Sequence, residues 1–306
     1  MTASTPGFGR GAIVDAVLNF MAGHPQQELD AIRADLEQQI DAAGPAAVEA
    51  LGRRLMTPAT HWGYYERDPL ARQLHRSLAD HLLLPSSTVH GIEHLDEVAG
   101  RPVVVIANHL SYSDGNLIEI LFHRAGADAF CDRLTVIAGP KVYSSVQRRF
   151  SSLCFGTIRV AQSSGVSSED AVMSARDVAR AARQSIDAAF TRLRAGDAVL
   201  VFPEGTRTRN REMGEFLAGV SRYLDQSGTI VLPVALTGTE EFFPIGAESV
   251  QRVRVVASIG APIDAGELSE SVGGDHQQVM DHIGHAIAAM LPREYRGVYE
   301  FEESAT

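Results

Sequence analysis

Short apolar runs that alternate with helix-like segments constrain the fold of this chain more than any other feature of its sequence. The runs lie at residues 103–107, 134–138, 157–161, 198–202, 229–236 and 252–259. The clearest helix between them is predicted at 168–194, where apolar residues recur with helical spacing, and Gly196 terminates it. This alternation predicts an α/β fold, in which helices flank a mixed central sheet.

The first part of the chain has a different pattern. Apolar residues recur there every three or four positions, as on one face of a helix, at Leu29, Ile32, Leu36 and Ile40. This run ends at Gly44 and Pro45, and similar patterns occupy residues 46–56 and 66–84. The sequence therefore predicts a small N-terminal helical domain at 1–85 and an α/β domain at 86–306.

The charge and cysteine content exclude some classes of protein. The chain of 306 residues has a formal net charge of −11, which argues against a nucleic-acid partner because phosphate binding needs an excess of Lys and Arg. Cys131 and Cys154 fit neither a metal-ligand spacing nor a disulfide framework. We therefore expect no metal site and a reducing, cytoplasmic location.

The apolar segments are too short to span a membrane. No window reaches the about 20 continuous apolar residues that a membrane-spanning helix needs. Asp15 interrupts the N-terminal apolar stretch and no small-residue cleavage site follows it, so we expect no secretory signal. The protein is expected to be soluble or peripheral to the inner face of the membrane. Residues 11–22 could contact a lipid surface, although packing in the core is the favoured interpretation.

The stretch ANHLSYSDG places a histidine and an aspartate directly after the apolar run at 103–107. Open α/β sheets bind ligands at the carboxyl ends of their strands, where this stretch would lie. If Asp114 accepts a hydrogen bond from one ring nitrogen of His109, the other nitrogen can act as a general base. Taken alone, however, the spacing favours an ordinary loop histidine and a helix-capping aspartate.

A second polar stretch follows the run at 198–202. It reads FPEGTRTR, with a turn at Pro203 and Gly205 followed by Arg207 and Arg209. Guanidinium groups donate paired hydrogen bonds to phosphate, and backbone N–H groups at a turn can add more. The alternative is a surface ion-pair cluster between Glu204 and the arginines.

Together, NHLSYSDG, FPEGTR and IVLPVAL (230–236) resemble the ordered motifs of the glycerolipid acyltransferase superfamily. This group includes the glycerol-3-phosphate and 1-acylglycerol-3-phosphate acyltransferases. The resemblance covers about residues 89–260. It implies that His109 is the general base and that Asp114 orients it. It also implies that Glu204, Gly205, Thr206 and Arg207 bind the acceptor phosphate and shape the site, and it places Lys141 where relatives often have lysine.

The chain departs from the family pattern at one position. Relatives carry a phosphate-binding arginine six positions after a glycine, whereas Gln162 stands six positions after Gly156 here. Arg159 lies nearby, but on a strand its side chain would point to the opposite face from position 162. Either the local geometry differs, or Arg209 compensates, or the anionic group of the acceptor is held differently.

The resemblance implies an O-acyltransferase. It would move a fatty acyl group from acyl-CoA or acyl carrier protein to a hydroxyl of glycerol 3-phosphate or a lysophospholipid, and it would need no metal or redox cofactor. The alternatives are a non-catalytic acyl or lipid-binding protein and an acyl-thioester hydrolase in which His109 activates water. The sequence does not determine the acyl donor, its chain length, the acceptor, the oligomeric state or the role of the N-terminal helices.

Overall fold

The central element is a sheet of nine strands, in which most neighbours are parallel. The computed structural model describes residues 8–161 and 174–301. The strand order is β1-β5-β4-β6-β3-β7-β8-β2, and β9 pairs with β7. Strands β5, β4, β6, β3 and β7 run parallel to one another, and β2 runs parallel to β8, whereas β1 is antiparallel to β5 and both β8 and β9 are antiparallel to β7. The expected mixed α/β sheet is confirmed.

Each of the six predicted strands overlaps an observed strand, whereas β1, β2 and β9 were not predicted. Their bounds are β1 Gly63–Tyr65, β2 Thr88–His90, β3 Val103–Ala107, β4 Leu134–Ala138, β5 Gly156–Arg159, β6 Ala198–Val201, β7 Ile230–Thr237, β8 Val256–Ile259 and β9 Ile263–Asp264. Two predicted strands, 103–107 and 134–138, match their observed bounds. The run at 252–259 forms a strand only in its second half. All five residues of β3 are fully buried, as expected for the centre of a sheet covered on both faces.

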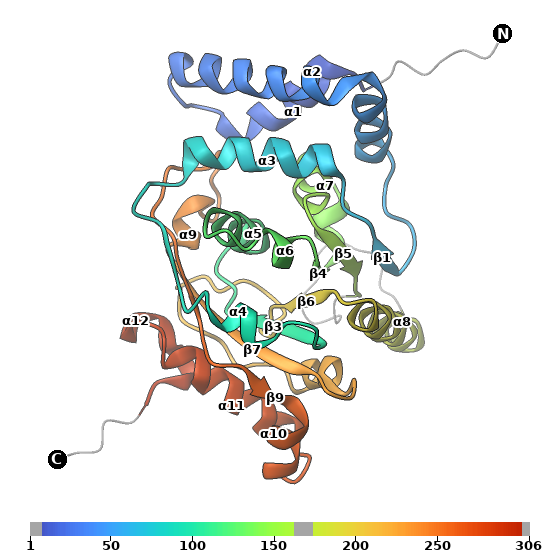
Figure 1. Cartoon of the computed structure of the whole chain (residues 1–306), viewed down its shortest axis with the longest axis vertical. Coiled ribbons are helices and arrows are strands. Elements are labelled where there is room, and N and C mark those ends of the chain that lie inside the picture. Colours follow the sequence, from blue (N-terminus) through green and yellow to red (C-terminus); the bar gives the residue numbers. More distant parts are fainter. Residues whose placement is uncertain (1–7, 162–173, 302–306) are drawn as a thin grey trace.

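Helices cover the sheet on both sides (Figure 1). The α-helices are α1 Arg10–Leu18, α2 Gln26–Met56, α3 Pro69–Leu82, α4 His94–Glu97, α5 Asp114–Arg124, α6 Asp128–Cys131, α7 Val146–Ser152, α8 Ala175–Arg194, α9 Thr239–Phe242, α10 Ala265–Ser271, α11 His276–Ala288 and α12 Arg293–Arg296. Short 3₁₀ helices lie at Asn19–Met21, Pro140–Tyr143, Ala218–Leu224 and Gly297–Tyr299. In Figure 1, α3 and α5 lie above the sheet and α11 lies below it. Residues 168–173 of the predicted helix at 168–194 lie outside the described residues.

The N-terminal helices pack as outer layers over α3 (Figure 1). Helix α2 is kinked at Gly44, whose φ of 80° is not helical, so the two helical segments predicted on either side of Gly44-Pro45 are both present. In α1, the apolar residues Ile13, Val14 and Val17 are fully buried in the core. The interpretation of residues 11–22 as core-packing is therefore confirmed. No helix of the described ranges is both long and apolar enough to cross a membrane.

One part of the N-terminal prediction was wrong. Residues 63–65, just before the helix predicted at 66–84, form strand β1, which pairs antiparallel with β5. The strand has only three residues and no run of alternating polarity, so its pairing depends on tertiary context. The N-terminal part thus contributes a strand to the sheet, and its apolar residues belong to the same continuous core as those of the sheet. The division into domains at residues 85 and 86 stays a prediction.

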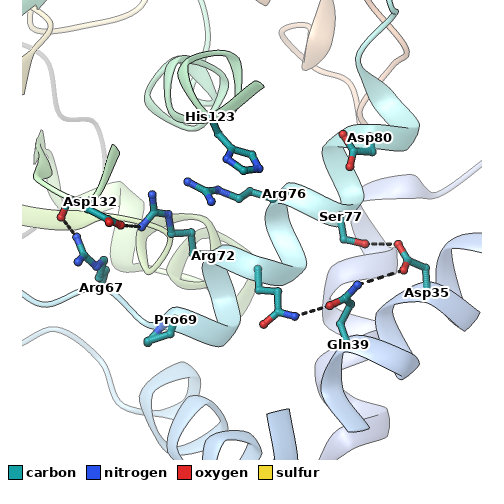
Figure 2. A pocket seen from close by; sticks show the side chains of 11 residues that line it. Asp35, Gln39, Arg67, Pro69, Arg72, Arg76, Ser77, Asp80, His123 and Asp132 are labelled. Carbon is teal, nitrogen blue, oxygen red and sulfur yellow. Dashed lines mark hydrogen bonds and ion pairs between the residues drawn. The ribbon is translucent and has the colours of Figure 1, made fainter. Parts of the chain in front are cut away.

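A buried ion-pair network connects α3 to α5 and α6. Glu119 of α5 is 1% exposed and accepts hydrogen bonds from Arg72 Nε at 2.7 Å and from Arg76 Nη2 at 2.6 Å. The same arginines also bind Asp132 and Asp128. Figure 2 shows this region, where a cavity of about 620 Å³ lies beside Arg72 and Arg76. Because both arginines are already neutralised by carboxylates, we interpret the network as a structural link.

Replacing Glu119 with Gln should destabilise the protein by about 3 kcal/mol, because breaking one partner of a buried ion pair leaves charge uncompensated. Urea unfolding measures this change. Glu97→Gln is the matched control, since Glu97 pairs with His94 but its side chain is 55% exposed. The control should change the free energy of unfolding by less than about 0.5 kcal/mol. Equal effects of the two substitutions would contradict the structural role of the network.

Candidate active site

The parallel pairing of β3 with β6 brings the two polar motifs to the same edge of the sheet. The register pairs Ile106 with Val201. His109 and Glu204 each lie three residues beyond these paired residues, on the loops that leave the carboxyl ends of the strands. Strand β7 runs parallel on the other side of β3 and ends at the same edge. The motifs are therefore juxtaposed, as the sequence predicted from the carboxyl-end rule.

His109 and Asp114 form a hydrogen-bonded pair. The distance from His109 Nδ1 to Asp114 Oδ2 is 2.9 Å. Asp114 is fully buried at the start of α5, where the helix dipole favours a negative charge, while the His109 side chain keeps 15% of its surface exposed. Because a carboxylate only accepts hydrogen bonds, we assign the Nδ1 proton to His109, which leaves Nε2 able to accept a proton.

The same oxygen of Asp114 also organises the loop. Oδ2 accepts hydrogen bonds from the backbone N–H groups of Leu110 at 2.7 Å and Ser111 at 2.9 Å. The aspartate therefore holds both the histidine ring and the backbone turn that carries it. The sequence left two interpretations of Asp114 open, a local structural residue and a hydrogen-bond partner of His109. In the structure Asp114 has both kinds of contact.

Two further residues fix the histidine, and the sequence analysis missed both. Asn108 is fully buried and exchanges two hydrogen bonds with Leu236 of β7, at 3.1 Å and 2.7 Å. The ring of Phe202 stacks on the ring of His109, with 4.4 Å between centroids and 21° between planes. Both residues are the first residues of the motifs NHLSYSDG and FPEGTR, so their place in these motifs was the available signal. Their partners, Leu236 on β7 and His109 on the loop after β3, lie far away in the sequence and could not be deduced from it.

Glu204 bridges two segments of backbone. Its Oε1 accepts a hydrogen bond from the His109 N–H at 2.8 Å, and its Oε2 accepts one from the Gly214 N–H at 2.9 Å. Burial raises the pKa of the Glu204 carboxyl to about 7, against the smaller opposing effect of these two N–H groups. The contacts of Glu204 are thus with the backbone that carries the histidine, and the role in phosphate binding implied by the resemblance stays a prediction.

The rest of the Glu-Gly-Thr-Arg block surrounds the same loop. Gly205 has a φ of +69°, in the left-handed region that favours glycine. The Thr208 N–H donates to the His109 carbonyl oxygen at 2.8 Å. Arg207 lies over the ring of Tyr112, with 4.1 Å from its Cζ to the ring centroid. Thr206 and Arg209 are exposed.

A second arginine, also missed by the sequence analysis, approaches Tyr112. Arg148 of α7 is exposed, and its Cζ lies 5.8 Å from the centroid of the Tyr112 ring. Its Nη1 donates to Ser144 Oγ at 3.0 Å and to the Lys141 carbonyl oxygen at 3.3 Å. Tyr112 is 46% exposed and lies three residues after His109. Arg207 and Arg148 therefore place two positive charges around one ring beside the candidate base.

Arg159, in contrast, is held by the N-terminal part of the chain. Its Nη1 donates to the carbonyl oxygen of Ala59 at 2.8 Å, and its guanidinium lies 4.3 Å from the centroid of the Trp62 ring. The ring centroid of Tyr143 lies 5.9 Å from Cζ of the same guanidinium group. None of these contacts joins Arg159 to His109 or to the block at 204–207. Gln162, the departure from the family pattern, lies outside the described residues.

The raised pKa of Glu204 predicts a pH-dependent stability. Between about pH 4.5 and pH 7 the folded protein keeps a proton on Glu204 that the unfolded chain releases, so the contribution of this group to stability falls as the pH rises through this window. Urea unfolding of the natural protein and of Glu204→Gln at pH 5, 6, 7 and 8 tests this. The difference between the two free energies of unfolding should decline up to about pH 7 and then level off. A difference that grows over that window would show that the pKa is lowered instead.

Comparisons with known proteins match the region of the chain that carries both motifs. The acyltransferase family model matches residues 86–237, which include both polar motifs. A 1-acyl-sn-glycerol-3-phosphate acyltransferase of Chlamydomonas reinhardtii is 27% identical over 213 residues, which cover 69% of this chain and 54% of that protein. A chloroplastic 1-acyl-sn-glycerol-3-phosphate acyltransferase of Arabidopsis thaliana is 36% identical over 58 residues, 19% of this chain and 16% of that protein. The chain thus spans about half the length of the first of these relatives, and much less of the second.

A solved structure was also found. The crystal structure of the 1-acyl-sn-glycerophosphate acyltransferase PlsC from Thermotoga maritima has 18% sequence identity and a TM-score of 0.48, with 92% of this chain and 93% of that chain covered. The family assignment depends instead on the matched region and on the motifs it contains. Through residues 86–237, this chain belongs to the glycerolipid acyltransferase superfamily.

Proposed function

We propose that the chain transfers a fatty acyl group from an acyl thioester to a hydroxyl of a phosphorylated glycerol or lysolipid, with His109 as the general base. The observation that carries this proposal is the His109–Asp114 pair, in which a buried carboxylate orients a partly exposed imidazole. The family membership supports acyl transfer as the reaction type. The names of the relatives support a 1-acylglycerol 3-phosphate as acceptor.

In the proposed reaction, His109 Nε2 removes the proton of the acceptor hydroxyl as its oxygen attacks the thioester carbonyl carbon. A new C–O bond forms, the C–S bond breaks, and the imidazolium returns the proton to the leaving thiolate. Asp114 stabilises the imidazolium through the bond at Nδ1. General-base assistance of this kind typically contributes about 10² to 10⁴ in rate.

The acceptor phosphate would bind at the cationic group around Tyr112. Arg207 comes from the block after β6 and Arg148 from α7, and their guanidinium groups approach the same ring. A phosphate held there would keep the acceptor hydroxyl near His109, three residues from Tyr112 in the same loop. Arg148 would thereby supply the second cation that the family pattern leads one to expect at position 162.

Incubation of the purified protein with acyl-CoA or acylated acyl carrier protein tests the function, with glycerol 3-phosphate or 1-acylglycerol 3-phosphate as acceptor. We expect acceptor-dependent thiol release and an acylated product. His109→Ala should reduce the rate by at least about 100-fold, because the general base is lost. His123→Ala is the matched control, since His123 also binds an aspartate five positions later, Asp128, at 2.7 Å but on the surface. The control should keep the natural rate.

Each other outcome favours a different function. Thiol release without acceptor would favour the hydrolase alternative, and no release with any acceptor or donor would favour a binding protein. Full transfer activity in His109→Ala would contradict the general-base mechanism.

Arg148→Ala should raise the KM for the phosphorylated acceptor by about tenfold with little change in kcat, because a charge-assisted hydrogen bond is worth about 1.5 to 3 kcal/mol. Arg53→Ala is the control, since Arg53 is an exposed arginine paired within helix α2. With a monoacylglycerol that lacks phosphate, Arg148→Ala and the natural protein should behave alike. An unchanged KM for the phosphorylated acceptor would show that Arg148 does not bind it.

A further inference from the structure

The C-terminal turn, formed by α12 and the 3₁₀ helix Gly297–Tyr299, lies outside the residues matched by the family model and packs on the loop at 211–216. The Met213 N–H donates to the Tyr295 carbonyl oxygen at 2.9 Å. The Met213 carbonyl oxygen accepts a hydrogen bond from the Val298 N–H at 3.2 Å. Met213 is therefore bound on both sides by the C-terminal turn, and its side chain is only 2% exposed.

The close approach of these two segments requires a glycine. Gly297 has a φ of +54°, and a Cβ at this position would lie 2.1 Å from the Met213 carbonyl oxygen. That separation is shorter than any Cβ contact tolerated without a shift of the backbone. The fit between the turn and the loop therefore depends on the absence of a side chain at 297.

Tyr299 makes a second attachment to the same loop. Its hydroxyl accepts a hydrogen bond from the Phe216 N–H at 2.8 Å, and its ring packs edge-on against Phe216 with 4.9 Å between centroids. Phe216 is fully buried and Tyr299 is 3% exposed. A Cβ at Gly284 of α11 would lie 2.5 Å from the Tyr299 ring, so α11 also leaves room for this tyrosine.

The loop held in this way is the one that holds Glu204. Gly214 lies between Met213 and Phe216, and its N–H donates to Glu204 Oε2 at 2.9 Å. The other oxygen of Glu204 accepts from the His109 N–H at 2.8 Å. A continuous path of backbone and hydrogen bonds thus runs from the C-terminal turn through Glu204 to the backbone of His109.

We propose that the C-terminal turn at 293–299 is a positioning element for His109, which acts through Met213, Gly214 and Glu204. This inference depends on the proposed function, because it assigns a role in placing the general base of that reaction. The turn touches no reacting atom. A displacement of about 1 Å at a reacting group can cost about 100-fold in rate, so a small shift of the loop would be enough to lower kcat.

Gly297→Ala tests the proposal, with Gly273→Ala as the matched control. Gly273 has a similar φ of +63°, but nothing lies within 4 Å of a Cβ placed there, so both substitutions strain the backbone and only one displaces Met213. We expect Gly297→Ala to lower kcat by about 10- to 100-fold with KM changed less than about threefold. Gly273→Ala should keep the natural kcat.

A milder pair of variants covers the case in which Gly297→Ala fails to fold. Tyr299→Phe removes the acceptor of the Phe216 N–H, and Tyr223→Phe removes a hydroxyl that contacts Ser185 at 3.2 Å, also in a buried position. Tyr299→Phe should lower kcat by about fivefold to tenfold, and Tyr223→Phe should not, even if both lose similar stability.

Proton NMR gives a readout that does not depend on activity. The His109 Nδ1 proton, which bonds to Asp114, should give a downfield signal that disappears in His109→Ala. We expect this signal to shift or broaden in Gly297→Ala and Tyr299→Phe and to stay in place in both controls. An unchanged signal together with an unchanged kcat in folded Gly297→Ala or Tyr299→Phe would overturn the proposal. Absence of transfer activity in the natural protein would instead contradict the proposed function, and the NMR comparison would still test the coupling.

Discussion

The parallel pairing of β3 with β6 is the constraint on which the candidate site depends. Because Ile106 lies opposite Val201, the chain leaves both strands at the same level, and His109 and Glu204 follow after equal numbers of residues. A slip of the register by one residue would turn the side chains of one strand to the other face and separate the two loops. The apolar residues of β3 and β6 are fully or almost fully buried, so the core itself enforces this register. The geometry of the site is thus a consequence of strand packing rather than of local loop preference.

Two carboxylates then fix the conformation of the loop that carries His109, because they accept hydrogen bonds from its backbone N–H groups. Asp114 accepts from Leu110 and Ser111 as well as from the imidazole, and Glu204 accepts from His109 itself. The N–H of Gly205 is also engaged, with the carbonyl oxygen of Phe202 at 3.2 Å. These backbone N–H groups are thus all occupied by contacts that hold the loop. The loop that carries His109 is therefore held in one conformation, since its backbone cannot move without breaking several hydrogen bonds.

The sequence predicted those features that local pattern controls. The central strands and the juxtaposition of the two motifs follow from apolar runs and from the carboxyl-end rule, and all were found. The contacts that it missed join residues far apart in the sequence. Asn108 binds a residue 128 positions away, and the bond from His109 to Glu204 spans 95 positions, so neither contact leaves a local pattern. The three-residue strand β1 was missed for the same reason, since it exists only through its pairing with β5.

The position of Arg159 shows how strand pairing at the edge of the sheet can keep an arginine away from the candidate site. Arg159 lies at the end of β5, and β1 covers the outer edge of β5. The Trp62 ring and the carbonyl oxygen of Ala59, both just before β1, hold the guanidinium. Moving it to an acceptor phosphate would break the hydrogen bond to Ala59 and leave the Trp62 ring without its cation. Arg207 and Arg148 lie around an exposed tyrosine, and the hydrogen bonds of Arg148 are exposed too, so a phosphate can approach both arginines without displacing a buried contact. For the proposed acceptor phosphate, Arg148 of α7 is therefore a better second cation than Arg159 of β5.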